Sequence, residues 1–205
     1  MAFTSYSELK TTIANYLARS DLTTQIPDFI RLGEIRLQRD LRTRQMLVVV
    51  TASTVSGDST VGLPNDFLEM RDIHLNTTPA TAVSYLSPNA FYSGARTTDS
   101  GKPVNYTVLG SELQLAPIPD TAYTLQMLYY AKPNALSDSV SSNVFLSNYP
   151  DALLYAALGE AEPYLMNDAR LQTWAALYDR AINAISVSDQ SSEYGGQPVS
   201  MSYVR

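Results

Sequence analysis

The spacing of apolar residues changes twice along this chain, and that order restricts its fold more than any single motif does. Helical spacing dominates residues 1–45, alternation typical of strands dominates residues 46–136, and helical spacing returns over residues 137–188. Residues 189–205 follow neither period. Each terminal helix pair has one strong apolar stripe per helix, so we expect the two pairs to bury these stripes against each other. The prediction is an α+β fold, a four-helix bundle with an inserted antiparallel β lobe and an extended C-terminal arm.

Two helices are predicted in the first 45 residues. The first extends over residues 6–19, after a capping box formed by Ser5 and Glu8. The second begins near Pro27, because proline is favoured in the first turn of a helix. The connection between them is short and polar, so the two helices are expected to run antiparallel.

The second helix and its C-terminal end carry five of the 14 cationic side chains, in a protein whose net charge is -6. A helical wheel places an apolar stripe on one side of it: Ile26, Phe29, Ile30, Gly33, Leu37 and Leu41. Arg31, Arg39 and Arg42 fall on the opposite side, with Leu32 and Ile35 between them. Arginine with interleaved aliphatics is typical of protein interfaces, so Arg31, Ile35, Arg39 and Arg42 form a candidate inter-subunit interface. The alternative is a solvated face with ion pairs along the helix.

The middle of the chain is rich in valine and threonine and contains several turn signals. This pattern predicts an antiparallel meander with one buried face. Strands are expected at 46–55, 71–76, 83–86, 104–108, 113–115 and 123–129, with one helical turn near 87–91.

Helical spacing returns after a polar linker. We expect Asn148 to cap a helix led by Pro150, and Pro163 to end or kink it. Asn167 or Asp168 is expected to cap the last helix. The core stripe of that helix is predicted to be Leu171, Trp174, Tyr178, Ala181, Ile182 and Ile185.

Negative charge is concentrated in the C-terminal part of the chain. Residues 134–193 contain eight acidic side chains and two arginines, which accounts for the whole net charge of -6. A protein that grips duplex DNA needs a basic excess, because neutralised phosphates supply most of the non-specific affinity. The composition therefore argues against tight DNA binding.

The final segment, residues 189–205, is expected to be loose in an isolated monomer. It still contains side chains that an extended arm would bury: Tyr194, Val199, Met201, Tyr203, Val204 and the terminal Arg205. Of these, Val199, Met201 and Tyr203 would share one face of a strand. Seventeen extended residues span about 55 Å, which is long enough to cross a neighbouring molecule. The alternative is a frayed tail without a role.

Few residues are candidates for chemistry. The chain has no cysteine, which excludes disulfides, thiolate nucleophiles and thiolate zinc sites, and His74 is its single histidine. Asp66, Glu69 and Asp72 are spaced like a carboxylate cluster for a divalent cation or for glycoside hydrolysis, although a solvated corner is the favoured interpretation. We therefore predict no catalytic residue, no metal site and no cofactor.

Neither export nor membrane insertion is indicated. Residues 1–9 lack the basic region and apolar run of an export signal. No window approaches the roughly 20 apolar residues that a bilayer span requires. The expectation is a protein made in the cytosol that contacts no membrane.

Several stretches, taken in order, resemble the head-to-tail adaptor (connector) proteins of short-tailed, podovirus-type bacteriophages, the tail tubular protein A-like family. None of the stretches is a catalytic signature, and together they cover nearly the whole chain. They are residues 16–22, 25–30, 34–44, 63–69, 113–117, 129–131, 149–155 and 174–179.

The resemblance implies a dodecameric ring that docks beneath the portal protein, with the tail nozzle protein attached below and genomic double-stranded DNA passing through without tight binding. It implies that the arm contacts the portal or adjacent subunits, and that the protein is a virion component assembled in the host cytoplasm. Two alternatives stay open. One is a virion-associated glycan hydrolase that uses the acidic corner formed by Asp66, Glu69 and Asp72, and the other is a non-viral ring or scaffold subunit.

Overall fold

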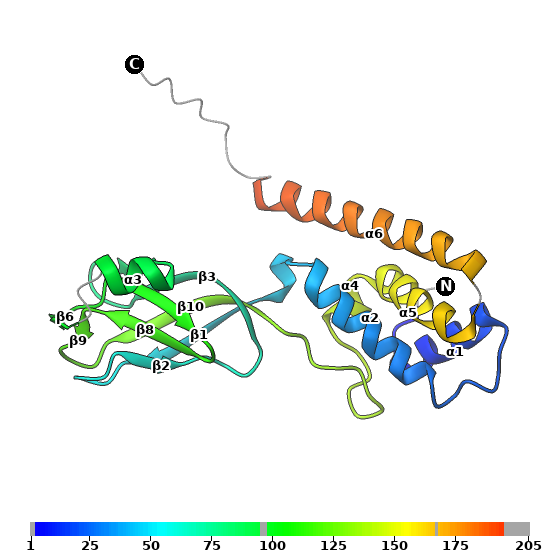
Figure 1. Cartoon of the computed structure of the whole chain (residues 1–205), viewed down its shortest axis with the longest axis horizontal. Helices are drawn as coiled ribbons and strands as arrows, with labels where there is room; N and C mark the ends of the chain where they lie inside the picture. Colours follow the sequence, from blue (N-terminus) through cyan, green and yellow to red (C-terminus); the bar gives the residue numbers. More distant parts are fainter. Residues whose placement is uncertain (1–2, 95–97, 167, 195–205) are drawn as a thin grey trace, which may run out of the picture. The chain divides into compact units, whose positions relative to one another are not determined.

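The computed structural model describes residues 3–94, 98–166 and 168–194, and the chain divides into two compact units (Figure 1). Residues 1–45 and 133–205 form the helical unit, and residues 46–132 form the β unit. The described part has six α-helices and several sheets that are mainly antiparallel. The predicted mixed α+β class is therefore confirmed, whereas the specific four-helix bundle stays a prediction.

The helical unit contains five of these helices. They are α1 (Tyr6–Leu17), α2 (Ile26–Asp40), α4 (Val144–Asn148), α5 (Pro150–Leu165) and α6 (Asp168–Tyr194). A short 3-10 helix, η1 (Arg44–Met46), spans the boundary between the units.

The β unit contains α3 (Pro88–Gly94) and all the described strands. These are β1 (Leu47–Ser53), β2 (Thr60–Gly62), β3 (Phe67–Leu75), β4 (Thr81–Ala82), β5 (Ser84–Tyr85), β6 (Ser100–Gly101), β7 (Asn105–Leu109), β8 (Glu112–Ala116), β9 (Ile118–Pro119) and β10 (Thr124–Ala131).

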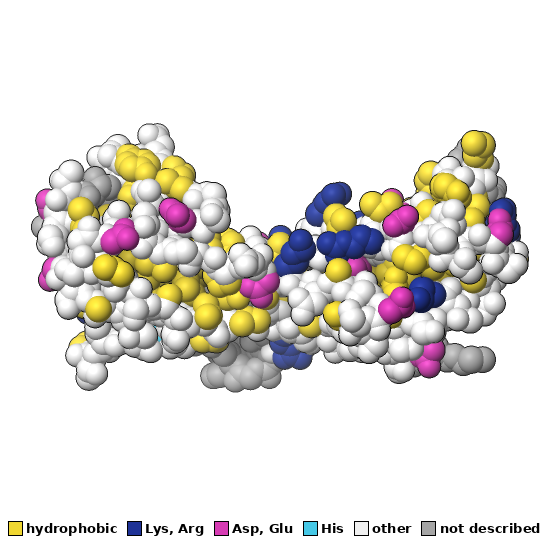
Figure 2. All heavy atoms as spheres, turned by 90° about the horizontal axis from the view of Figure 1, so that it is seen from below, with side chains coloured by type: hydrophobic (Ala, Val, Ile, Leu, Met, Phe, Trp, Pro, Cys, Tyr) yellow, Lys and Arg dark blue, Asp and Glu magenta, His cyan; other side chains and the backbone are white. Residues whose placement is uncertain are grey.

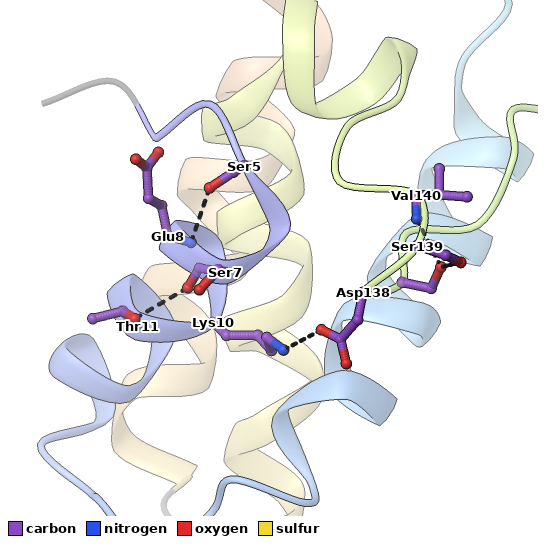
Figure 3. Close-up of polar contacts among 9 residues, drawn as sticks. Ser5, Ser7, Glu8, Lys10, Thr11, Asp138, Ser139 and Val140 are labelled. Carbon is purple, nitrogen blue, oxygen red and sulfur yellow. Dashed lines mark hydrogen bonds and ion pairs between the residues drawn. The ribbon is translucent and has the colours of Figure 1, made fainter.

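The first helix begins and ends with well-defined caps. The Ser5 side chain accepts a hydrogen bond from the Glu8 N–H at 3.3 Å (Figure 3), and the Glu8 carboxylate accepts one from the Thr4 N–H at 2.7 Å. The capping interaction expected from the sequence is thus confirmed. The helix ends where Ala18 takes a left-handed conformation, with φ of 52°.

Helix α5 is the centre of the helical unit, because it contacts α1, α2, α4 and α6. Apolar side chains on all of its sides are buried, as expected for a helix enclosed by others. They include Ala152, Leu153, Leu154, Ala156, Ala157, Leu158 and Ala161. Pro163, which was expected to end or kink this helix, does not end it: α5 continues two residues further, to Leu165, and ends in a left-handed cap at Met166.

The apolar stripe predicted for α2 is confirmed, since all six of its members are buried. At its middle, α2 approaches α5 so closely that a Cβ on Gly33 would lie 3.0 Å from the Ala157 backbone nitrogen. A contact of this length is tighter than nine in ten real Cβ contacts, so any side chain at position 33 would require the α5 backbone to shift.

A buried glutamate fastens the connecting segment 133–143 to α2. Glu34 is 1% exposed, and its Oε1 accepts hydrogen bonds from the Leu136 N–H at 3.0 Å and from Asn143 Nδ2 at 2.7 Å. The Asn143 side chain in turn caps α4 through the Leu146 N–H. The Lys10–Asp138 ion pair, at 2.8 Å, adds a bond from α1 to the same segment (Figure 3).

The expected cap at Asn148 is wrong. Asn148 is the last residue of α4, and its Nδ2 donates to the Val144 carbonyl oxygen. Tyr149 precedes α5 and makes no side-chain cap. Helix α4 has only five residues and was not predicted, so Asn148 was assigned as the cap of the following helix.

Helix α6 runs beside α5 and is largely exposed (Figure 1). Of its side chains from 170 to 192, only Tyr178 and Ala181 are buried; the other members of the predicted core stripe are half-buried. The helix continues to Tyr194. Residues 189–194, expected to begin an irregular arm, are therefore helical.

The single meander predicted for the β unit is wrong, because its strands form two four-stranded sheets and a small third one. The first sheet has the order β1-β10-β3-β4, and the second has the order β2-β8-β7-β5. Strands β6 and β9 form the third, which is parallel. Strand β1 pairs antiparallel with β10, so that Leu47 lies opposite Tyr130. The strands that lead into and out of the β unit are thus neighbours.

The core of the β unit draws on both large sheets. Ile73, Leu75, Leu125 and Met127 come from the first sheet, and Val61, Tyr106, Leu113 and Leu115 come from the second. One face of each sheet is buried against this common core.

We expect Gly33→Ala to destabilise the helical unit by about 1–2 kcal/mol, because overpacking against Ala157 outweighs the better helix propensity of alanine. Chemical denaturation followed by fluorescence measures this, since Trp174, in α6, is the single tryptophan. Gly159→Ala in α5 is the matched control: its Cβ would lie 3.7 Å from the Arg36 guanidinium, an ordinary contact. It should be neutral or stabilising by up to about 1 kcal/mol. Equal effects of the two variants would contradict the close approach.

Glu34→Ala should cost about 1–3 kcal/mol, because the Leu136 N–H loses its acceptor and the Asn143 amide keeps only its bond to the Asn134 carbonyl oxygen. The same fluorescence measurement applies. Asp138→Ala removes only the exposed ion pair to Lys10, in which the Asp138 side chain is 88% exposed. This control should change stability by less than about 0.5 kcal/mol. A Glu34 variant as stable as the control would show that the connecting segment is held by other contacts.

Candidate inter-subunit surface

The side of α2 opposite its buried stripe borders a surface hollow of about 430 Å³. Its lining combines aliphatic and charged side chains: Leu32, Ile35, Arg36, Arg39 and Asp40 of α2, and Glu160 of α5. Leu32 is 46% exposed and Arg39 is also exposed. Figure 2 shows Lys and Arg side chains grouped on one face of the helical unit. We name the six lining residues the α2 surface.

Three charged members of the α2 surface interact within the unit. Arg36 lies 3.9 Å from Glu160 and 4.0 Å from Asp40, and its guanidinium stacks 4.1 Å above the Tyr178 ring. The Tyr178 hydroxyl donates to Asp40 Oδ2 at 2.6 Å. Burial and this bond to a carboxylate raise the pKa of Tyr178. These contacts join α2, α5 and α6.

The four residues of the predicted interface are not all placed alike. Ile35 and Arg39 line the hollow. Arg31 is half-buried and lies 3.3 Å from Glu34. Arg42 lies beyond the end of α2 and donates to the carbonyl oxygens of Gln38 and Leu41, at 2.6 and 2.7 Å.

Arg39 therefore differs from its neighbours. Among the residues that the structure describes, no ion-pair or hydrogen-bond partner is found for its side chain. The alternative of a solvated, internally paired face fits Arg36, which pairs with Asp40 four residues on. It does not account for exposed Leu32 beside an unpaired arginine.

The acidic corner, Asp66, Glu69 and Asp72, does not form a metal site in the described residues. The side chain of Asp66, before β3, accepts a hydrogen bond from the Tyr129 hydroxyl at 3.0 Å, whereas Glu69 and Asp72 lie exposed along β3. Within the described ranges, no three Asp, Glu or His side chains are arranged to hold a metal ion. His74 lies 3.4 Å from Asp72 and is half-buried. No described contact favours the hydrolase interpretation.

Of the predicted arm residues, the structure describes only the first. Tyr194 is the last residue of α6, and Val199, Met201, Tyr203, Val204 and Arg205 lie outside the described residues. The described helices include none with the length and apolar character that crossing a membrane requires.

A comparison with protein families identifies the class of the chain. The family model of bacteriophage structural adaptors described as "SU10 adaptor protein" matches residues 4–202, nearly the whole sequence. The chain belongs to the SU10 adaptor protein family. Membership implies a structural component of the phage virion that interacts with other virion proteins, such as those of the portal and tail. No curated protein matches the chain.

The Tyr129–Asp66 bond can be tested by titration. Burial and the bond to this carboxylate raise the pKa of Tyr129 to about 12. Asp66→Asn removes the negative charge, so we expect the pKa of Tyr129 to fall but to stay above 10, because burial, the larger cause, remains. Carbon-13 NMR of the labelled tyrosine rings measures this pKa.

Tyr123 supplies the internal control for that titration, because its pKa is raised mainly by a separate hydrogen bond, to Asp120. It should titrate identically in both proteins. An unchanged pKa of Tyr129 in the Asp66→Asn variant would contradict the hydrogen bond between these two side chains.

Proposed function

We propose that this protein is a head-to-tail adaptor of a short-tailed bacteriophage, related to the tail tubular protein A-like connectors. In this proposal twelve copies form a ring between the portal and the tail nozzle, and genomic DNA passes through the ring. Family membership over residues 4–202 carries the proposal. The open α2 surface supports it, because a subunit that assembles needs a surface with unsatisfied contacts.

The contact between subunits is proposed to join the α2 surface of one copy to the acidic C-terminal helices of the next. Arg39 supplies an unpaired positive charge, and α6 offers exposed Asp179 together with the exposed aliphatic Val187. Exposed ion pairs contribute only about 0–1 kcal/mol each. Burial of Leu32 and Ile35 is therefore the larger contribution, within an interface of about 1,200–2,000 Å².

The charge of the chain suits a conduit for DNA. Its acidic excess repels phosphate and so avoids tight capture of the duplex. The C-terminal arm is proposed to contact the portal or an adjacent subunit, which adds a connection that the folded units do not make.

The proposal is tested by mixing the full-length protein with the purified portal protein of the same phage. Mass photometry and negative-stain electron microscopy should show a ring on the portal. The double variant Ile35→Asp, Arg39→Glu should weaken this assembly at least about tenfold, because it places two negative charges against an acidic partner. Circular dichroism should show an unchanged fold.

Arg19→Glu is the matched control, since Arg19 is an exposed arginine of the same unit that pairs with Asp21 outside the α2 surface. It should assemble normally. Normal assembly of the double variant would remove the α2 surface from the proposal. A wild-type protein that never assembles with the portal, or that degrades a sugar polymer, would overturn the adaptor function.

A further inference from the structure

Strand β1 is an open edge of the β unit. In the first sheet it pairs with β10 on one side, and within the described residues no strand pairs with its other side. The seven residues, Leu47–Ser53, contain four aliphatic side chains of Leu and Val and no charged residue or proline. Val48 and Val49 are 40% and 55% exposed.

The ladder shows which backbone groups point outward. The Thr54 N–H donates to the Tyr123 carbonyl at 2.9 Å, just beyond the pair Ser53–Thr124. Antiparallel pairs alternate between hydrogen-bonded and non-hydrogen-bonded, so the even-numbered residues of β1 bond to β10. The N–H and C=O groups of Leu47, Val49, Thr51 and Ser53 therefore point away from it, toward the open edge.

The other edges of the two large sheets are short. Strand β2 has three residues, and β4 and β5 have two each. Proteins commonly protect sheet edges by shortening them or by adding lysine, proline or a bulge. Strand β1 has none of these protections, which indicates that its edge is covered when the protein assembles. Figure 2 shows hydrophobic side chains spread over one face of this unit.

One segment of the chain has the length and pattern to cover that edge. Residues 195–205 are the longest run outside the described residues, and the others have three residues or fewer. From Val199 to Tyr203 this segment alternates apolar residues with serine, as a strand does. Residues 199–205 match the seven residues of β1 in number.

We propose that residues 199–205 of one copy add as a strand to the open edge of β1 in a neighbouring copy. The proposal rests on the proposed function and deepens it, because it assigns the arm to the adjacent subunit. If the β1 strands of two copies paired with each other, both open edges would be used and the assembly would stop at a two-fold dimer. An arm on the next copy's edge is a head-to-tail contact, which can continue from subunit to subunit around a ring.

Engineered cysteines test the contact directly, because the natural chain has none. Full-length protein with Val49→Cys is mixed, under mild oxidation, with full-length protein carrying one cysteine at position 199, 200, 201, 202 or 203. Non-reducing gels and peptide mass spectrometry identify the disulfides. We expect bonds between chains at alternate arm positions only, because neighbouring residues of a strand point to opposite faces.

Blocking the edge gives a second measurement. Val49→Pro removes an outward N–H that β10 does not use, and Thr51→Lys places a charge at the open edge. Val49→Pro should weaken assembly of the full-length protein on the portal by about tenfold, the effect of losing one or two backbone hydrogen bonds. Thr51→Lys keeps its backbone N–H and should also weaken assembly, because a charged side chain opposes strand addition at the edge. Val49→Ala keeps the N–H and is the matched control. Deletion of 195–205 leaves every described helix intact and should act like the edge variants.

The outcomes separate this inference from the adaptor function. Normal rings from the edge variants and from the deletion, with no disulfide between chains, would overturn the inference and leave the adaptor function standing. Disulfides only between two Val49→Cys chains would indicate β1–β1 pairing and overturn it. A Val49→Cys, Met201→Cys chain that bonds only within itself would overturn it as well. Failure of the wild-type protein to assemble on the portal would count against the adaptor function itself.

Discussion

The close contact between α2 and α5 is the constraint on which the helical unit depends. Gly33 lets the α2 backbone approach Ala157, and α5 in turn contacts every other helix of the unit. Packing on that side fixes which side of α2 faces outward. The contacts of Arg36 and Asp40 in α2 with Glu160 in α5 and Tyr178 in α6 depend on this packing. The α2 surface is therefore a consequence of core packing.

Sequence reasoning succeeded where the interactions are local. The capping box at Ser5 and the buried stripe of α2 are set by residues three or four apart, and both are confirmed. It failed where partners are distant in the chain. The pairing of β1 with β10 joins residues more than 70 positions apart, and no local pattern specifies such a partner. The prediction of a single meander was wrong for that reason.

The candidate surface shows the same division between local and distant interactions. A helical wheel identifies Ile35 and Arg39 as outward-facing, and both line the hollow. It cannot show that Glu34 is buried against the connecting segment beside Arg31, or that Arg42 turns back to the last carbonyls of α2. Arg31 and Arg42 thus make contacts within the helical unit, and their role in an interface stays a prediction. The wheel also placed Leu32 among the arginines, and this side chain is an exposed aliphatic member of the α2 surface.

The adjacency of β1 and β10 has an evolutionary consequence. The polypeptide leaves the helical unit at residue 45 and returns at 133, and the two crossing points are tied together by one antiparallel pair. For the helical unit, the β unit is therefore equivalent to a single hairpin, whose two ends lie at a fixed distance from each other. Domains of other sizes could replace it without changing the distance that the helical scaffold must bridge. Loop-closure entropy also changes only slowly with the length of an insertion. The β unit can thus change in size while the helical unit keeps its architecture.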